Sequence, residues 1–236
     1  GAIYFGNAVG TTGLTGSAAI TNVVLGGGFG RNLSVVNTSG TLNRLVVTGS
    51  TFNQTAATSV GDNLAVEART GATALNVTVN TSTFNGVAGD QIDATGQTGT
   101  SMDVIVNGNT LTNAHPLNAI GGGGVSLQSQ GTAYRFDFLN NTLRGAHGSA
   151  LTLFKAFDGV SFRGTVGNNV IGQVGVLGSG SVTGNGIFLS AAGNSDAQNI
   201  VLALTNNQIY GYSGNAAIYA DNTGGTAAIS YGGSIS

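Results

Sequence analysis

The charged side chains of this chain are few, and several occupy matching positions of a repeated pattern. They make up 7% of the 236 residues. Eight residues before a recurring apolar residue lie, in successive repeats, Arg44, Asn76, Asp103, Arg135 and Arg163. An enzyme that cleaves a uronate polysaccharide needs a basic side chain to abstract a proton and carboxylates to hold calcium. That need is met only in part by the four charged residues Asp103, Arg135, Asp137 and Arg163. We therefore favour a structural ladder of ion pairs between rungs over a lyase site.

Adjacent asparagines recur in FLNNTLRG from Phe138, VGNNVIGQ from Val166 and LTNNQIYG from Leu204. The second asparagine of each pair lies two residues before the recurring apolar residue. The asparagines at that position are Asn109, Asn141, Asn169 and Asn207. If the repeats stack, each side-chain amide can donate to the next side-chain carbonyl, which predicts a structural asparagine ladder. We favour this ladder over glycan attachment, for which Asn140-Asn141-Thr142 has the required pattern.

Other polar residues fit structural roles better than chemical ones. Asp62 and Asp90 occupy a turn position that carries serine or asparagine in later repeats. His115 and His147 follow the recurring apolar residue by four positions in neighbouring repeats, but a third metal ligand is not evident. We expect both histidines on surface loops. The chain has no cysteine, and we predict no catalytic residue, no bound cofactor and no metal site.

The recurring apolar residue marks an internal repeat of 27 to 38 residues. Its copies are Leu25, Phe52, Phe84, Leu111, Leu143, Ile171 and Ile209. Apolar residues five and seven positions before most copies predict a strand with one buried face. A second strand follows, as in GRNLSVV from Gly30 and GDNLAVE from Gly61. The connection between the two strands varies in length, so we predict a contact surface on one edge, formed by loops 53–63, 112–124 and 172–186.

A minimal repeat of about 27 residues, with two strands, glycine turns and no helical period, predicts an all-β solenoid of about seven rungs. The pattern resembles the right-handed parallel β-helix of the pectin-lyase-like superfamily, with its generic parallel β-helix repeats, over nearly the whole chain. The resemblance implies a right-handed coil. It does not imply one function, because the superfamily includes polysaccharide lyases, hydrolases, bacterial surface adhesins, surface filaments and phage tailspikes.

Composition excludes several classes of protein. The formal net charge is -2 and basic residues are scarce, which argues against a nucleic-acid partner. A hydrophobic fraction of 41% argues against intrinsic disorder. No apolar run approaches the roughly 20 residues that a membrane-spanning helix needs, so we predict no membrane insertion.

We expect one β-solenoid domain over residues 1–236 that begins and ends within a rung. Residues 2–5 resemble the second strand of a repeat, and the final segment AAISYGGSIS resembles the first strand of another. The carboxyl end would therefore supply what the amino end lacks. We predict end-to-end contacts through Ile3, Phe5, Ile229, Tyr231 and Ile235.

These features together predict an extracellular structural or adhesive β-helix of a bacterial surface, such as a stalk, a fibre or a component of a surface array, without catalysis. The expected partner is a second copy stacked head to tail, or neighbouring parts of a longer surface protein. The alternative is a carbohydrate-binding β-helix or a polysaccharide lyase or hydrolase. That alternative would use the face around Arg135 and Arg163.

Overall fold

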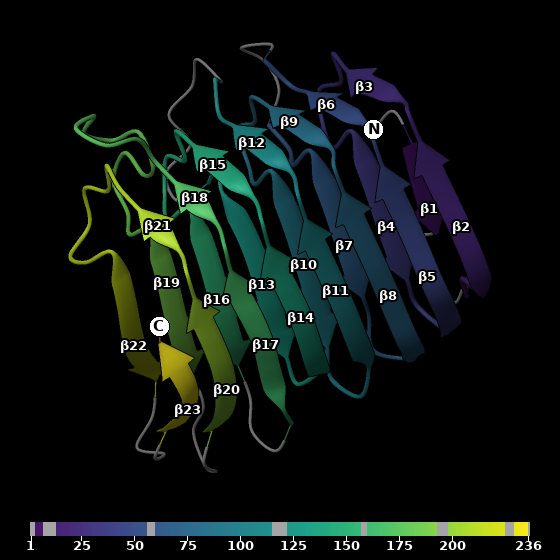
Figure 1. The fold of residues 1–236 in the computed structure, drawn as a ribbon. Coiled ribbons are helices and arrows are strands. Elements are labelled where there is room, and N and C mark those ends of the chain that lie inside the picture. The colour runs from purple at the N-terminus through teal and green to yellow at the C-terminus, as the bar shows by residue number, and fades with distance from the viewer. Residues whose placement is uncertain are drawn as a thin grey trace.

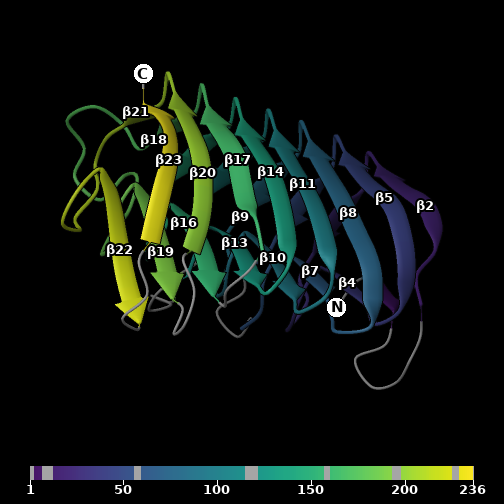
Figure 2. The same ribbon diagram turned by 90° about the horizontal axis from the view of Figure 1, so that it is seen from below.

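The described chain forms three parallel sheets that stack into a rod (Figure 1). The computed structural model describes residues 3–6, 13–55, 60–114, 122–156, 160–192, 198–224 and 229–235. All regular elements in these ranges are strands. Figure 2 shows the second sheet as one curved row, with β2 at one end of the stack and β23 at the other.

Each sheet takes every third strand along the chain. The first sheet contains β1 (Ile3–Gly6), β4 (Leu33–Asn37), β7 (Leu64–Ala68), β10 (Ile92–Gln97), β13 (Val125–Gln130), β16 (Leu151–Ala156), β19 (Ile187–Ala192) and β22 (Ile218–Gly224). The second sheet contains β2 (Gly16–Thr21), β5 (Gly40–Thr48), β8 (Ala72–Asn80), β11 (Ser101–Asn107), β14 (Ala133–Leu139), β17 (Phe162–Gly167), β20 (Gln198–Thr205) and β23 (Ile229–Ile235). The third, shorter sheet contains β3 (Val24–Gly26), β6 (Thr51–Asn53), β9 (Thr83–Asn85), β12 (Thr110–Thr112), β15 (Thr142–Arg144), β18 (Val170–Ile171) and β21 (Gln208–Ile209).

Matching residues of successive rungs lie beside one another in the parallel ladders. In the second sheet, for example, Val77 pairs with Val104, and Val104 pairs with Phe136. Because the side-chain period of a strand is two, this register keeps every inward position inward from rung to rung. The predicted all-β parallel β-solenoid is confirmed, and its number of turns is close to the predicted seven rungs.

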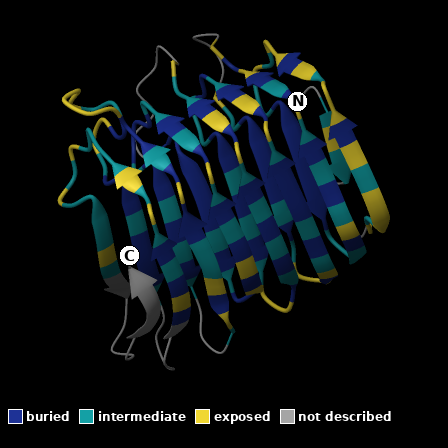
Figure 3. Cartoon of the chain, in the orientation of Figure 1, coloured by how far each residue is buried: buried dark blue, intermediate teal, exposed yellow. Residues whose placement is uncertain are grey.

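The recurring apolar residues form the core between the sheets (Figure 3). Phe52 and Phe84 are fully buried and stack with ring centroids 4.6 Å apart. Further along the rod, Phe136 packs against Phe162, with ring centroids 5.1 Å apart. Gly164 follows Phe136 in the same inward row, and a side chain there would meet the phenylalanine ring at 2.6 Å. The missing side chain of this glycine therefore makes room for the aromatic packing.

A sharp turn between the second and third sheets explains the paired asparagines. The first residue of the turn has a positive φ, at 56° in Asn140 and Asn168 and 53° in Asn206. Asparagine and glycine tolerate this left-handed conformation better than other residues. The second asparagine of each pair then points into the rod. The first asparagine therefore makes the turn, and the second is available for bonding between rungs.

Candidate functional site

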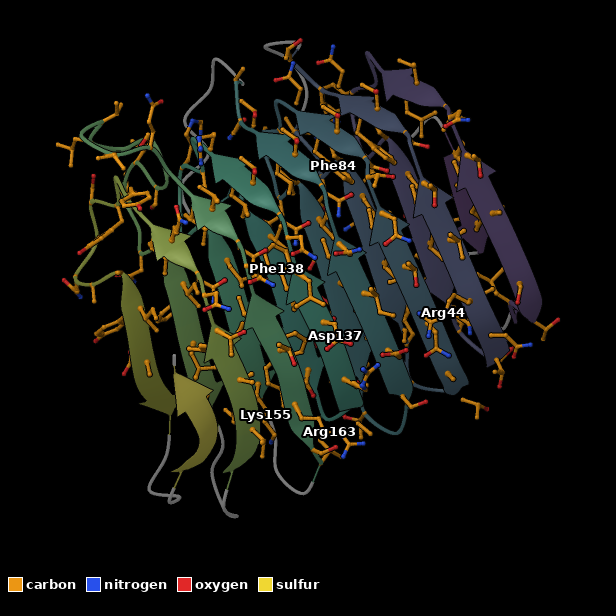
Figure 4. All side chains as sticks on the ribbon, viewed as in Figure 1. Arg44, Phe84, Asp137, Phe138, Lys155 and Arg163 are labelled. Carbon is orange, nitrogen blue, oxygen red and sulfur yellow. The ribbon has the colours of Figure 1, made fainter. Side chains whose placement is uncertain are left out.

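The predicted polar face, formed by Asp103, Arg135, Asp137 and Arg163, lies on the outer surface of the second sheet (Figure 4). Arg135 Nη1 lies 2.7 Å from Asp103 Oδ1, and Arg135 Nη2 lies 2.6 Å from Asp137 Oδ2. Arg44 also forms an ion pair with Asp103. The Asp137 carboxylate, together with the hydrogen bonds that Arg135 donates to both aspartates, raises the pKa of Arg135 above its ordinary value. Both carboxylates therefore neutralise arginines on this face.

Arg44, which forms the ion pair with Asp103, lies in a β-bulge of β5. Leu42 pairs with Leu75 and Leu45 with Val77, so two residues of β5 face one residue of β8. Arg44 Nη1 also donates to Thr78 Oγ1 at 2.8 Å. The sequence pattern aligned Arg44 with Asn76 but did not predict the extra residue.

Arg163 stands apart from the other members of the polar face. Its strand neighbour is Arg135, and its side chain is exposed. Among the described residues it makes no ion pair or hydrogen bond. A shallow hollow of about 300 Å³ lies beside it, lined also by Thr165, Val201 and Ala203. This guanidinium is the one charge of the predicted polar face that the described residues do not neutralise.

The four predicted ladder asparagines lie in one line through the rod. Asn109 Nδ2 donates to Asn141 Oδ1 at 3.0 Å, and Asn141 Nδ2 donates to Asn169 Oδ1 at 3.1 Å. Asn169 Nδ2 donates to Asn207 Oδ1 at 2.9 Å. Each of these oxygens also accepts the backbone N–H of the preceding ladder residue. Ser82 extends the line, since its backbone N–H donates to Asn109 Oδ1 at 2.9 Å.

A second buried ladder precedes the first sheet and was not predicted. Asn32 Nδ2 donates to Asn63 Oδ1 at 2.7 Å, and Asn63 Nδ2 donates to Gln91 Oε1 at 2.6 Å. All three side chains are fully buried. Their signal was present in GRNL, GDNL and GDQI, where an amide residue stands just before the first apolar residue of the strand.

Asp62 and Asp90 lie in the turn position that the sequence assigned to them. Asp62 Oδ1 accepts the Asp90 backbone N–H at 2.9 Å, and Asp62 Oδ2 lies 3.0 Å from Arg31 Nε. Burial, with the nearby carboxylates of Asp93 and Asp62, raises the pKa of Asp90 to about 8. Burial, followed by the carboxylate of Asp62, raises the pKa of Asp93 to about 6. The outer face of the first sheet thus carries carboxyl groups that titrate near neutral pH.

The expectation of two surface histidines was wrong for His147, because it is 8% exposed. Its backbone N–H donates to Gly122 O at 3.1 Å, within a turn that later rungs cover. His115 lies outside the described residues. No group of three or more potential metal-ligating side chains occurs among the residues described. The sequence also offered no sign that Lys155, at an inward position of β16, is fully buried (Figure 4).

The loop edge consists of the third sheet and the loops that follow its strands (Figure 1). Loop 172–186 is described completely, whereas parts of loops 53–63 and 112–124 fall outside the described residues. Ser179 holds the long loop together: its Oγ accepts from Gln173 N at 2.7 Å and donates to Val176 O at 2.6 Å. Gly180 N donates to Gly211 O in the next rung at 3.0 Å. The loop is therefore ordered by its own hydrogen bonds and by the rung beside it.

The predicted end-to-end residues lie in the first and last rungs described. Ile3 and Phe5 are partly buried and pack against the core. Ile229, Tyr231 and Ile235 belong to β23, which pairs with β20, but their side chains fall outside the description. The end-to-end contacts therefore stay a prediction.

No protein-family model, curated protein or solved structure matches this chain. The parallel solenoid is thus established by the register of its own strands, while membership of the pectin-lyase-like superfamily stays a prediction. Within the described ranges, no helix has the length and apolarity needed to cross a membrane.

Proposed function

We propose that this protein is a non-catalytic structural and adhesive β-helix of a bacterial surface, which is one of the roles found in the superfamily that it resembles. The rod serves as a rigid support, and the loop edge makes the contacts. The observation that carries this proposal is the position of exposed apolar side chains. Seven of the nine large ones in the described chain lie on the loop edge: Val24, Phe29, Val60, Val174, Val176, Leu177 and Val182.

Loop 172–186 is the best-supported contact element of this edge. Val174 is 69% exposed and Leu177 is 83% exposed, and the loop contains no charged residue. Large exposed apolar patches on soluble proteins commonly mark interaction sites. Because hydrogen bonds already order the loop, little conformational entropy is lost when it binds.

Replacing Val174 and Leu177 together with serine is expected to lower adhesion at least about twofold, because most of the apolar area of the loop is lost. The measurement is retention of protein-coated beads on hydrocarbon-coated glass under flow. Tyr4→Ser is the matched control, since Tyr4 is 49% exposed but lies on the first sheet. Equal retention of the double variant and the wild type would contradict a contact role for the loop.

The proposed support role includes assembly of copies head to tail, through Ile3 and Phe5 at one end and Ile229, Tyr231 and Ile235 at the other. Strand edges at the ends of a solenoid favour this kind of association. Electron microscopy of the purified protein at high concentration is expected to show filaments of rod width. Monodisperse particles without strings would count against assembly, and the loop-edge contact would be unaffected by that result.

One observation favours the alternative of a carbohydrate-binding or carbohydrate-cleaving β-helix. The Arg163 guanidinium has no ion-pair or hydrogen-bond partner among the described residues and lies beside a hollow, and arginine binds carboxylates well. Against cleavage, Asp103 and Asp137 are engaged by arginines and so are poorly placed to hold calcium. Incubation with acidic polysaccharides, with and without calcium, separates the two functions. New unsaturated sugar ends would overturn the non-catalytic proposal.

A further inference from the structure

The outer face of the first sheet carries a second hollow, on a different sheet from the polar face. It has a volume of about 370 Å³ and is lined by Asp90, Ser126, Gln128, Thr152 and Phe154. Asp90 precedes β10, and the others come from β13 and β16, which lie side by side in the sheet. In the register of these strands Ser126 faces Thr152 and Gln128 faces Phe154. The hollow therefore combines one aromatic side chain with four polar ones.

Several polar groups of this hollow have unused hydrogen-bonding capacity. Gln128 Nε2 donates to Ser126 Oγ at 2.8 Å. In the described part of the chain, the Gln128 side-chain oxygen, the Thr152 hydroxyl and the Asp90 carboxyl make no hydrogen bond. Binding sites typically place a few such convergent polar groups beside an apolar surface. A ligand with several hydroxyl groups would satisfy them.

The charge of this face selects against an acidic ligand. The carboxylates of Asp93 and Asp62 lie near Asp90. Glu67 lies near Asp93, and Arg69 is paired with Glu67 at 3.0 Å. Carboxylates would repel a uronate or a sulfate. With its pKa raised to about 8, the Asp90 carboxyl is largely protonated at neutral pH and can donate a hydrogen bond as well as accept one.

Aromatic side chains continue from the hollow along the rod. Thr152 faces Phe188 in the next rung, and Phe188 faces Tyr219 in the one after. The rings of Phe188 and Tyr219 are stacked, with centroids 5.8 Å apart and planes 16° apart. Both side chains are half-buried. Phe154 faces Ser190 and so lies diagonally from Phe188, two residues further along the strand. The three aromatic side chains, which we call the aromatic strip, thus lie on three successive rungs of one sheet, and an extended ligand could contact more than one of them.

We propose that the hollow around Phe154 binds a neutral sugar ring of a glycan chain that lies along the aromatic strip. The ring stacks on Phe154 while its hydroxyl groups bond to Asp90, Gln128 and Thr152. This inference deepens the adhesive function proposed above by naming a ligand class, and it rests on that function for its biological role. The loop edge and the sugar site are separate surfaces, so each can fail without the other.

The test is titration of the purified protein with neutral hexasaccharides of glucose, mannose, galactose and xylose, followed by NMR line broadening and calorimetry. Oligogalacturonate serves as the acidic probe. At least one neutral hexasaccharide is expected to bind. Phe154→Ala is expected to weaken that binding about tenfold or more, because the stacking surface is lost. Gln128→Ala, at a half-buried position, is expected to weaken it about threefold to tenfold.

Tyr4→Ser is the matched control, because Tyr4 is an exposed aromatic residue of the same sheet face, far from the hollow along the rod. The affinity of the Tyr4→Ser protein for the sugar is expected to equal that of the wild type. Far-UV circular dichroism shows whether each variant folds. If Phe154→Ala does not fold, the affinity of Gln128→Ala for the sugar decides the test.

Three results would overturn the sugar site: no neutral hexasaccharide binds, a folded Phe154→Ala protein binds as the wild type does, or oligogalacturonate binds more tightly than every neutral probe. If the Val174 and Leu177 variant still loses bead retention while no sugar binds, the adhesive function stands and only the sugar site is wrong. If sugar binds but the loop variant keeps its retention, the loop-edge contact is wrong instead.

Discussion

Replacing Asn141 with alanine is expected to lower the free energy of unfolding by about 3–5 kcal/mol. Asn141 is 1% exposed and lies in the middle of the ladder. Its Oδ1 accepts from the backbone N–H and the Nδ2 of Asn109, and its Nδ2 donates to Val106 O and Asn169 Oδ1. Alanine would leave two buried donors of Asn109 without this acceptor, and each unsatisfied buried group costs about 1–3 kcal/mol.

The measurement is urea unfolding followed by circular dichroism, with amide hydrogen exchange at Asn109 as a local probe. Thr110→Ala is the matched control, because Thr110 is exposed in the same region of the rod and only its backbone bonds to Ser82. The control is expected to change stability by less than about 0.5 kcal/mol. A loss below about 1 kcal/mol for Asn141→Ala would show that water or local rearrangement replaces the ladder bonds.

Stability is expected to fall by several kcal/mol as pH rises from 4 to 8, on the order of 5 kcal/mol of it from Asp90, since each unit of pKa shift is worth about 1.4 kcal/mol. The pKa of Asp90 is raised from 3.8 to about 8 in the folded protein. Between these values the folded chain keeps a proton that the unfolded chain releases, so folding is most favourable below pH 4 and weakens as pH rises to 8. Asp93, with a pKa of about 6, adds to the loss between pH 4 and 6.

Asp90→Asn is expected to remove most of this pH dependence and to raise stability at pH 8, because the amide cannot ionise in the half-buried site. The backbone N–H of residue 90 would still donate to Asp62 Oδ1. Asp137→Asn, on the second sheet, is the control that should keep the wild-type slope. The measurement is the urea midpoint of unfolding at each pH from 4 to 8. A wild-type midpoint that does not change over this range would rule out a strongly raised pKa of Asp90.

Some side-chain contacts could be predicted from the repeat in the sequence, and others could not. Asn141 and Asn169 have the same residue type at the same distance from the recurring apolar residue, so their stacking could be predicted. The ladder through Asn32, Asn63 and Gln91 was missed because it mixes residue types over only three rungs. The ion pair of Arg44 with Asp103 depends on a bulge and on the reach of a long side chain, which no spacing encodes.

The parallel solenoid, the inward rows and the edge on which insertions gather could all be predicted from the spacing of residues along the chain. This is possible because stacked strands must repeat their buried positions at each rung, and a shift of one residue would reverse every side chain. The burial of His147 and Lys155, the raised pKa of Asp90 and the hollow beside Phe154 became apparent only in the folded chain. These properties arise where loops of unequal length and neighbouring rungs cover a side chain, and that covering is a property of three-dimensional packing.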